Sequence, residues 1–117
     1  MKTVTVYGLP ARFEDSRVPL LQLLETHISE ASSQIDGGEP VGSVNLPAIH
    51  NQFHFSPEVV VYADGFVPFH TTSSRFSELK KRVQEKIKEV VSNWLKIVRQ
   101  NSNIRVDDVK AVRVIVS

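Results

Sequence analysis

The feature that most constrains the fold is a short Val-rich pattern that occurs twice along the chain. Residues 4–8 read Val-Thr-Val-Tyr-Gly, and residues 59–65 read Val-Val-Val-Tyr-Ala-Asp-Gly. β-Branched residues that run up to a glycine are typical of a strand followed by a turn, so each pattern predicts one strand. In the first strand, over residues 3–7, alternation places Val4 and Val6 on one face. The unbroken apolar run over residues 59–62 instead predicts a strand that is covered on both faces.

An amphipathic helix is predicted after each of these strands, because apolar residues recur there at spacings of three and four. We expect the first helix to take its cap from Asp15 or Ser16, with Pro19 in its first turn, and to stop at Gly37-Gly38. The second helix is expected over residues 74–99. Both helices open at a Ser-Arg step, and their positions correspond at an offset of 58 or 59 residues: Ser16-Arg17 with Ser74-Arg75, then Leu20, Leu24 and Ile28 with Leu79, Val83 and Ile87.

Further strands complete two β-α-β units. A strand is expected over residues 109–116, where valines alternate, and short strands are expected over 41–44 and 52–55. The chain is therefore predicted to be a single domain, residues 1–117, with pseudo-repeat halves 1–55 and 56–117. The predicted fold class is α/β, with two tandem β-α-β units that form a two-layer sandwich of one mixed sheet and two helices on one face. A ferredoxin-like arrangement of the same elements is the alternative.

Composition and charge narrow the classes of function. The chain has no cysteine, which excludes disulfide scaffolds, zinc ribbons and thiol nucleophiles. No apolar run approaches the roughly 20 residues of a membrane span, so we expect no membrane partner and a cytoplasmic location. The formal net charge of +1 divides into −5 over residues 1–72 and +6 over residues 73–117. Because no aromatic residues alternate with the basic ones, we expect the oppositely charged halves to attract each other, within a chain or between subunits, and expect no nucleic-acid partner.

The second half carries a family resemblance. Its helix opens Ser74-Arg75-Phe76-Ser77-Glu78-Leu79-Lys80-Lys81, the apolar stripe continues through Val83, Ile87 and Val91, and the closing strand reads Val112-Arg113-Val114-Ile115-Val116. These segments resemble the tautomerase superfamily, which includes the macrophage migration inhibitory factor and hydroxymuconate isomerase groups. The resemblance covers residues 58–117, and the first half only through the repeat. Long members fuse two β-α-β units and assemble as trimers, so the resemblance implies a tautomerase-like fold and a homotrimer.

The resemblance also implies a site at the start of the chain. The general base of the family is an amino-terminal proline, whereas this chain begins Met1-Lys2 and has no proline before Pro10. The α-amine of Met1 is then the candidate catalytic base. Arg75 matches the helix-opening arginine that binds a substrate carboxylate in the family, and Arg17 is its repeat equivalent. Lys2 is the third candidate substrate-binding residue, because it adds positive charge beside the chain start.

Two functions follow from these observations. The first is a tautomerase-like isomerase relative that binds a small carboxylate-bearing keto or enol compound and needs no cofactor. Whether it catalyses a reaction is left open by the sequence. The second is a non-catalytic, oligomeric protein-interaction module that meets its partner through the charge division. No metal site is expected, because His50 and His54 would lie about 13 Å apart in a strand, and because His70 and Asp64 are better explained as surface residues.

Overall fold

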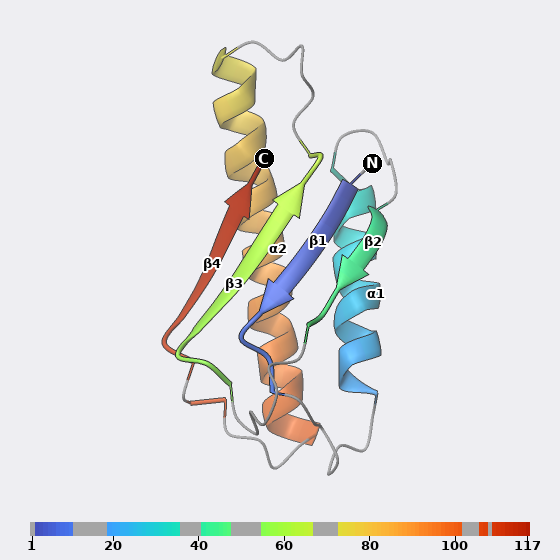
Figure 1. The fold of residues 1–117 in the computed structure, drawn as a ribbon, viewed down its shortest axis with the longest axis vertical. Helices are drawn as coiled ribbons and strands as arrows, with labels where there is room; N and C mark the ends of the chain where they lie inside the picture. The colour runs from blue at the N-terminus through green and yellow to red at the C-terminus, as the bar shows by residue number, and fades with distance from the viewer. Residues whose placement is uncertain are drawn as a thin grey trace.

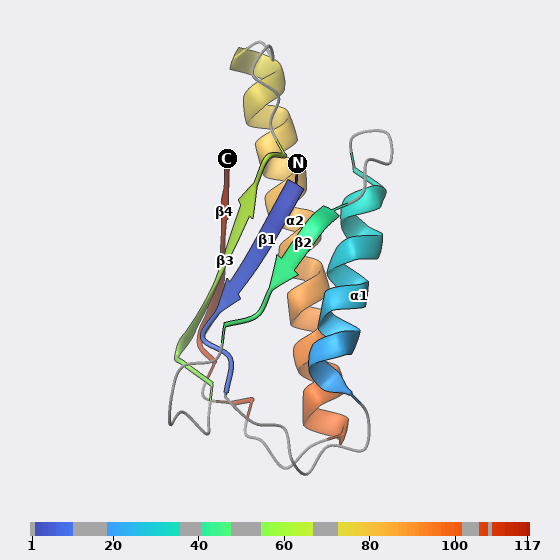
Figure 2. The same cartoon turned by 45° about the vertical axis from the view of Figure 1, so that its right-hand side comes forward.

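The computed structural model describes residues 2–10, 19–35, 41–47, 55–66, 73–101, 106–107 and 109–117. Along these residues lie strand β1 (Lys2–Tyr7), helix α1 (Leu20–Ser33), strands β2 (Val41–Asn45) and β3 (Glu58–Asp64), helix α2 (Ser73–Asn101) and strand β4 (Ala111–Val116). The strands form one sheet in the order β2-β1-β3-β4. Both helices cover the same face of this sheet and leave its other face open (Figure 1, Figure 2).

Each helix connects two parallel strands, and the two units meet at an antiparallel pair. β1 runs parallel to β2, β3 runs parallel to β4, and β1 runs antiparallel to β3. The predicted two-layer α/β fold, with its mixed sheet and tandem β-α-β units, is therefore confirmed. The ferredoxin-like alternative is wrong, because its split units place another strand between the two parallel strands, whereas here those strands are direct neighbours.

The central strand pair is symmetric in its register. Val6 is paired with Val61, and Tyr7 and Tyr62 lie one step to either side of this pair, opposite Val60 and Thr5 respectively. The two tyrosine rings meet edge to face, with centroids 5.6 Å apart. An approximate twofold relation through the Val6–Val61 pair therefore exchanges the two tyrosines. This register supports a repeat, and the boundaries of the halves, 1–55 and 56–117, stay a prediction.

The core lies between the sheet and the two helices. Trp94 of α2 is fully buried, as its place on the apolar stripe indicates, and its Nε1 donates a 2.7 Å hydrogen bond to the carbonyl of Leu20. The indole also meets the buried ring of Phe55 edge to face. These contacts join α2 to the start of α1 and to the segment before β3. The inward side chains of the two central strands are fully buried against this layer: Val4, Val6, Val59, Val61 and Ala63.

The prediction that β3 is covered on both faces is wrong for this chain. Burial alternates along the strand, so that Val59 and Val61 are buried, whereas Val60 is half-buried and Tyr62 is 40% exposed. The physical reason is that both helices pack on one side of the sheet, so only every second residue of the valine run faces them. The other residues belong to the open face.

The start of α1 also differs from the prediction. The helix begins at Leu20, after Pro19, whose carbonyl accepts a 3.0 Å hydrogen bond from the backbone N–H of Leu23. A cap from Asp15 or Ser16 is therefore wrong, because the residue before a proline is driven out of the helical conformation and the helix starts only after it. Both residues lie outside the described part of the chain, as do Gly37 and Gly38, and α1 ends earlier, at Ser33.

The remaining boundaries shift by a few residues. α2 spans 29 residues, slightly more than the predicted 74–99, and β4 begins at Ala111 rather than at residue 109. Of the short strand expected over 52–55, only Phe55 is described, and it lies outside any strand. Within the described ranges, neither helix has an apolar stretch long enough to cross a membrane.

Candidate functional site

The candidate site is the end of the sheet where β1 begins. β3 and β4 finish at this end, both chain termini lie there, and α2 starts beyond it (Figure 1). Because β1 and β3 are antiparallel, Thr3 is paired with Asp64, which brings the chain start beside the residues that follow β3. The site is therefore built from both β-α-β units.

Lys2 is buried at this end of the sheet. Its side chain is 1% exposed, and its Nζ lies 5.2 Å from the centroid of the Phe66 ring. A cation over an aromatic face is attracted by the electrons of the ring, by about 0.5–2 kcal/mol depending on how far it is desolvated. The contact holds the first residue of β1 against the segment after β3. So little of Lys2 is exposed that it offers a ligand little surface to touch, and its role in substrate binding stays a prediction.

Arg75 lies in the first turn of α2, and its side chain is exposed. The first turn of this helix contains no acidic residue, so no carboxylate of its own neutralises the positive end of the helix dipole. A guanidinium beside the unpaired N–H groups of a helix start suits a planar anion. This end of α2 therefore has the chemistry that carboxylate binding needs.

The other predicted residues of the site fall outside the described residues. These are Met1, the candidate base, and Arg17, the repeat equivalent of Arg75. His50, His54 and His70 lie outside them as well. Within the described ranges, no group of three or more His, Cys, Asp or Glu side chains is placed to hold a metal ion. The roles of Met1 and Arg17 stay predictions.

Sequence reasoning missed how the ends of β3 and β4 shape this region. The backbone N–H of Ser117 donates to the carbonyl of Ala63 (2.9 Å), and the N–H of Phe66 donates to the carbonyl of Ser117 (3.2 Å). The hydroxyl of Ser117 also donates to the carboxylate of Asp64. These bonds fix Phe66, on which Lys2 rests. The sequence did predict that the last two strands pair in parallel. Knowledge of the register of this pairing would have shown that the ends of β3 and β4 lie side by side.

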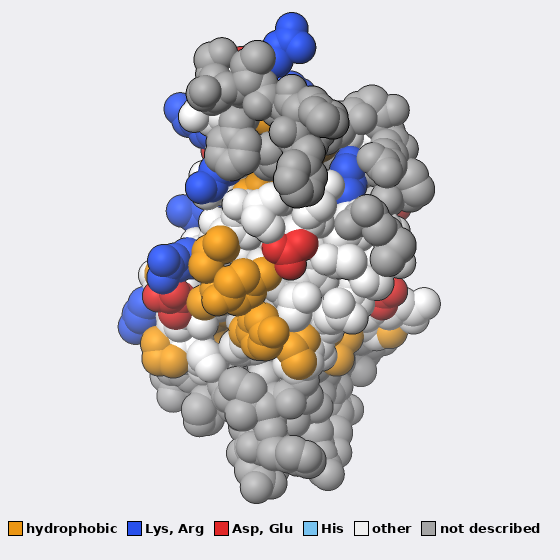
Figure 3. Space-filling view, turned by 45° about the horizontal axis from the view of Figure 1, so that its top comes forward, with side chains coloured by type: hydrophobic (Ala, Val, Ile, Leu, Met, Phe, Trp, Pro, Cys, Tyr) orange, Lys and Arg blue, Asp and Glu red, His pale blue; other side chains and the backbone are white. Residues whose placement is uncertain are grey.

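The open face of the sheet carries a second feature, an apolar patch made of Tyr7, Val60, Tyr62 and Ile115. The two tyrosines are 44% and 40% exposed, and Val60 and Ile115 are half-buried. Tyr62 pairs with Ile115 across β3 and β4, which makes the patch continuous over three strands. Figure 3 shows this apolar strip, with Lys and Arg side chains gathered along one side of it. We call this surface the open-face patch.

Comparison with known proteins gives matches among solved structures alone, since no family model and no curated protein matches the chain. A fused 4-OT, described as an asymmetric trimer, is 16% identical with a TM-score of 0.61 over 98% of this chain and 84% of that chain. 5-Carboxymethyl-2-hydroxymuconate delta-isomerase is 11% identical with a TM-score of 0.57, over 100% and 83%. Pt0534, inactivated by 2-oxo-3-pentynoate, is 16% identical with a TM-score of 0.51, over 99% and 84%. All three are tautomerase superfamily members, and the chain has the fold of that superfamily.

Proposed function

We propose that the protein is an isomerase-like homotrimer that binds a small carboxylate-bearing keto or enol compound at the end of the sheet where β1 begins. The observation that carries this proposal is the presence of two cationic side chains, Arg75 and Lys2, at that end. Arg75 is exposed in a first helical turn without acidic residues, and Lys2 is buried at the start of β1, at the same end of the sheet (Figure 1). The fold is shared with a delta-isomerase, which supports the same class of chemistry. The predicted cytoplasmic location stays a prediction.

In the proposed reaction the ligand carboxylate binds to Arg75 and to the N–H groups at the start of α2. This contact holds the ligand carbon beside the keto group near the chain start. The ligand then meets the base in a fixed orientation rather than by a chance encounter. The α-amine of Met1 takes a proton from that carbon and returns it to the enolate, so that the keto and enol forms interconvert and the amine is regenerated.

Exchange of carbon-bound protons in D₂O tests this reaction directly. We expect the protein to accelerate the loss of the C3 proton signal of 2-oxobutanoate, followed by ¹H NMR. Arg75→Gln is expected to lower kcat/KM by about fivefold or more, because a charged hydrogen bond at an exposed side chain contributes on the order of 1 kcal/mol. Arg82→Gln is the matched control, since it removes an exposed arginine from the same helix, and should change the rate by less than about twofold.

A two-residue extension of the amino terminus tests the candidate base. If Met1 provides the amine, the extension abolishes the exchange while 2-oxobutanoate still binds. Full activity in the extended protein excludes Met1 as the base. If the unextended protein binds 2-oxobutanoate through Arg75 but does not exchange its protons, the protein is a non-catalytic relative of the isomerases. Absence of both binding and exchange contradicts the proposed ligand class and favours the interaction module.

The homotrimer is supported by the open-face patch. Its two tyrosines expose apolar rings on a surface that the helices of the same chain do not reach. Burial of apolar area stabilises an assembly by about 25 cal/mol per Å², so covering the patch with other subunits is favourable. Assembly into a trimer would also cover the second face of β3. The sequence of β3 is typical of a strand that is buried on both faces.

Light scattering after size exclusion tests the assembly. We expect the wild type to have three times the mass of one chain and Tyr62→Lys to have the mass of one chain, because the new ammonium would lose its hydration in the interface. Gln22→Lys is the matched control, since it adds the same charge at an exposed position of α1. A wild-type protein with the mass of a single chain contradicts the trimer.

A further inference from the structure

A cavity of about 480 Å³ lies at the other end of α2 from the candidate site. It is bounded by the second half of α2, by Val106, Asp107, Val109 and Lys110 before β4, and by the first residues of β4. Its volume is within the range of about 300–1,000 Å³ that small-molecule sites occupy. Neither Lys2 nor Arg75 lines it, so the cavity is separate from the candidate site.

The floor of this cavity is apolar and rests on the core. Leu95 and Val106 are buried, and Val109 and Val112 are half-buried and pack against the same core cluster. Because Leu95 belongs to α2 and Val112 to β4, this part of the floor does not have to form when a ligand arrives. An apolar ligand segment of a few carbons would be removed from water here at about 0.8 kcal/mol per buried CH₂ group.

The rim of the cavity is cationic. Lys88, Arg99 and Lys110 line it together with one carboxylate, that of Asp107, which leaves a formal charge of +2 for these four side chains. Within the described part of the chain, no carboxylate is paired with Lys88. The neighbouring Arg105 and Asp108, whose charges cancel, lie outside the described residues.

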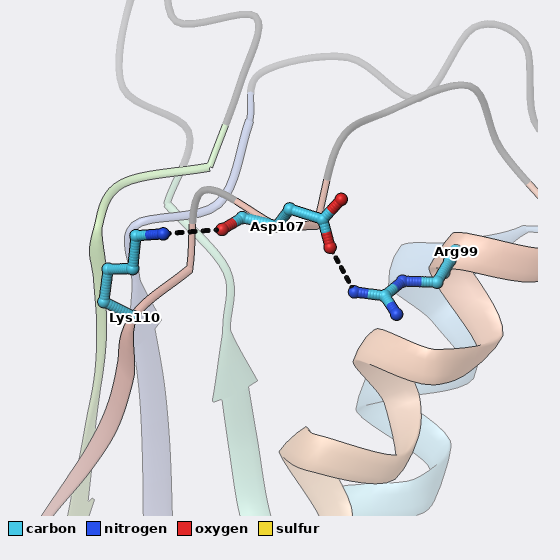
Figure 4. Close-up of polar contacts among 3 residues, drawn as sticks. All are labelled: Arg99, Asp107 and Lys110. Carbon is cyan, nitrogen blue, oxygen red and sulfur yellow. Dashed lines mark hydrogen bonds and ion pairs between the residues drawn. The ribbon is translucent and has the colours of Figure 1, made fainter.

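Asp107 links two of the three cations (Figure 4). Its carboxylate forms an ion pair with the guanidinium of Arg99, and its backbone carbonyl accepts a 3.3 Å hydrogen bond from Lys110 Nζ. The side chains of Arg99 and Asp107 are 64% and 71% exposed, so solvent screens the pair and it is easily exchanged. The carboxylate of Asp107 therefore occupies the guanidinium that an anionic ligand at this rim would use.

We propose that this cavity is a binding site for an amphipathic monoanion, a carboxylate attached to an apolar tail. The tail lies on the floor formed around Leu95 and Val112, and the carboxylate lies at the rim beside Arg99, while Lys88, about three helical turns away on α2, adds positive charge at the other end of the rim. A neutral apolar molecule would leave the excess positive charge of the rim uncompensated, and a small inorganic anion would leave the floor uncovered. Asp107 competes with the ligand for Arg99 and so weakens the binding that the other rim residues provide.

Octanoate is the probe, and calorimetry measures its dissociation constant. We expect it to bind at least about tenfold more tightly than octan-1-ol, which lacks the negative charge, and than inorganic phosphate, which lacks the apolar tail. Asp107→Asn is expected to strengthen binding by about three- to fivefold, since it removes the competing carboxylate and keeps the backbone carbonyl that Lys110 contacts. A gain of affinity cannot come from partial unfolding.

Arg99→Gln is expected to weaken octanoate binding by about three- to fivefold, because it removes the guanidinium that the ligand carboxylate contacts. Lys86→Gln is the matched control, because Lys86 lies on the same helix but lines the groove beside α1 with Glu30, and its removal changes the net charge equally. The proposal is overturned if Asp107→Asn does not strengthen binding, if Lys86→Gln weakens it as much as Arg99→Gln, or if octan-1-ol binds as tightly as octanoate. Arg75→Gln should leave octanoate binding unchanged, which separates this site from the proposed isomerase site.

Discussion

Replacement of Gly8 by alanine is expected to destabilise the protein by about 2–4 kcal/mol. Gly8 ends β1 with φ at +99°, a conformation that costs an L-residue about 1–2 kcal/mol. An added Cβ would lie 2.8 Å from the carbonyl oxygen of Glu58 and 3.3 Å from Cβ of Ser56. The first contact is with backbone at the start of β3, so rotation of a side chain cannot relieve it. Moving the two strands apart adds about 1–2 kcal/mol, as overpacking of a tight site does.

Urea unfolding measures this loss. The transition is followed by far-UV circular dichroism, and we expect a lower midpoint with an unchanged m-value, because the variant alters strain rather than the surface exposed on unfolding. Gly42→Ala is the matched control, since Gly42 is exposed in β2 and its φ is not positive. That variant should change the free energy of unfolding by less than about 0.5 kcal/mol or increase it slightly. A loss below about 0.5 kcal/mol for Gly8→Ala, or equal losses for both variants, refutes the reasoning.

Two other substitutions separate a buried polar contact from an exposed one. Trp94→Phe removes the buried hydrogen bond from the indole N–H to the carbonyl of Leu20, so thermal unfolding by circular dichroism should show a loss of about 1–2 kcal/mol; an unchanged melting temperature contradicts this role. Arg113→Gln removes an ion pair with Glu58 that spans 3.8 Å between side chains 66% and 48% exposed. Its effect should stay below about 0.5 kcal/mol, and a loss above about 1 kcal/mol would show that the pair is not screened by solvent.

Local periodicity accounts for what the sequence predicted correctly. Alternation in β1 identified Val4 and Val6 as inward residues, and the spacing of apolar residues placed α2 within two residues of its observed ends. The valine run of β3 was misread because the number of covered faces is not a property of the strand. It depends on where the helices pack, and both pack on one side, which exposes Tyr62.

The candidate site was predicted in part for the same reason. The position of Arg75 in a first helical turn follows from the helix start alone, and the structure places it there. Burial of Lys2 depends on Phe66, which is distant in the sequence and reaches β1 only through the antiparallel pairing of the two units. The cavity at the far end of α2 also requires Val106 and Asp107 to return beside Leu95 and Arg99, and no periodic pattern signals such a turn.

The proposed isomerase function requires that a small 2-oxo acid binds where β1 begins. Titration of the ¹⁵N-labelled protein with 2-oxobutanoate, followed by two-dimensional NMR, shows whether and where it binds. We expect saturable shifts of the backbone amides of Thr3, Phe66 and Arg75, and no comparable shifts around Val109. Shifts confined to the region of Val109, or none at concentrations where the proton exchange is measured, would contradict this requirement.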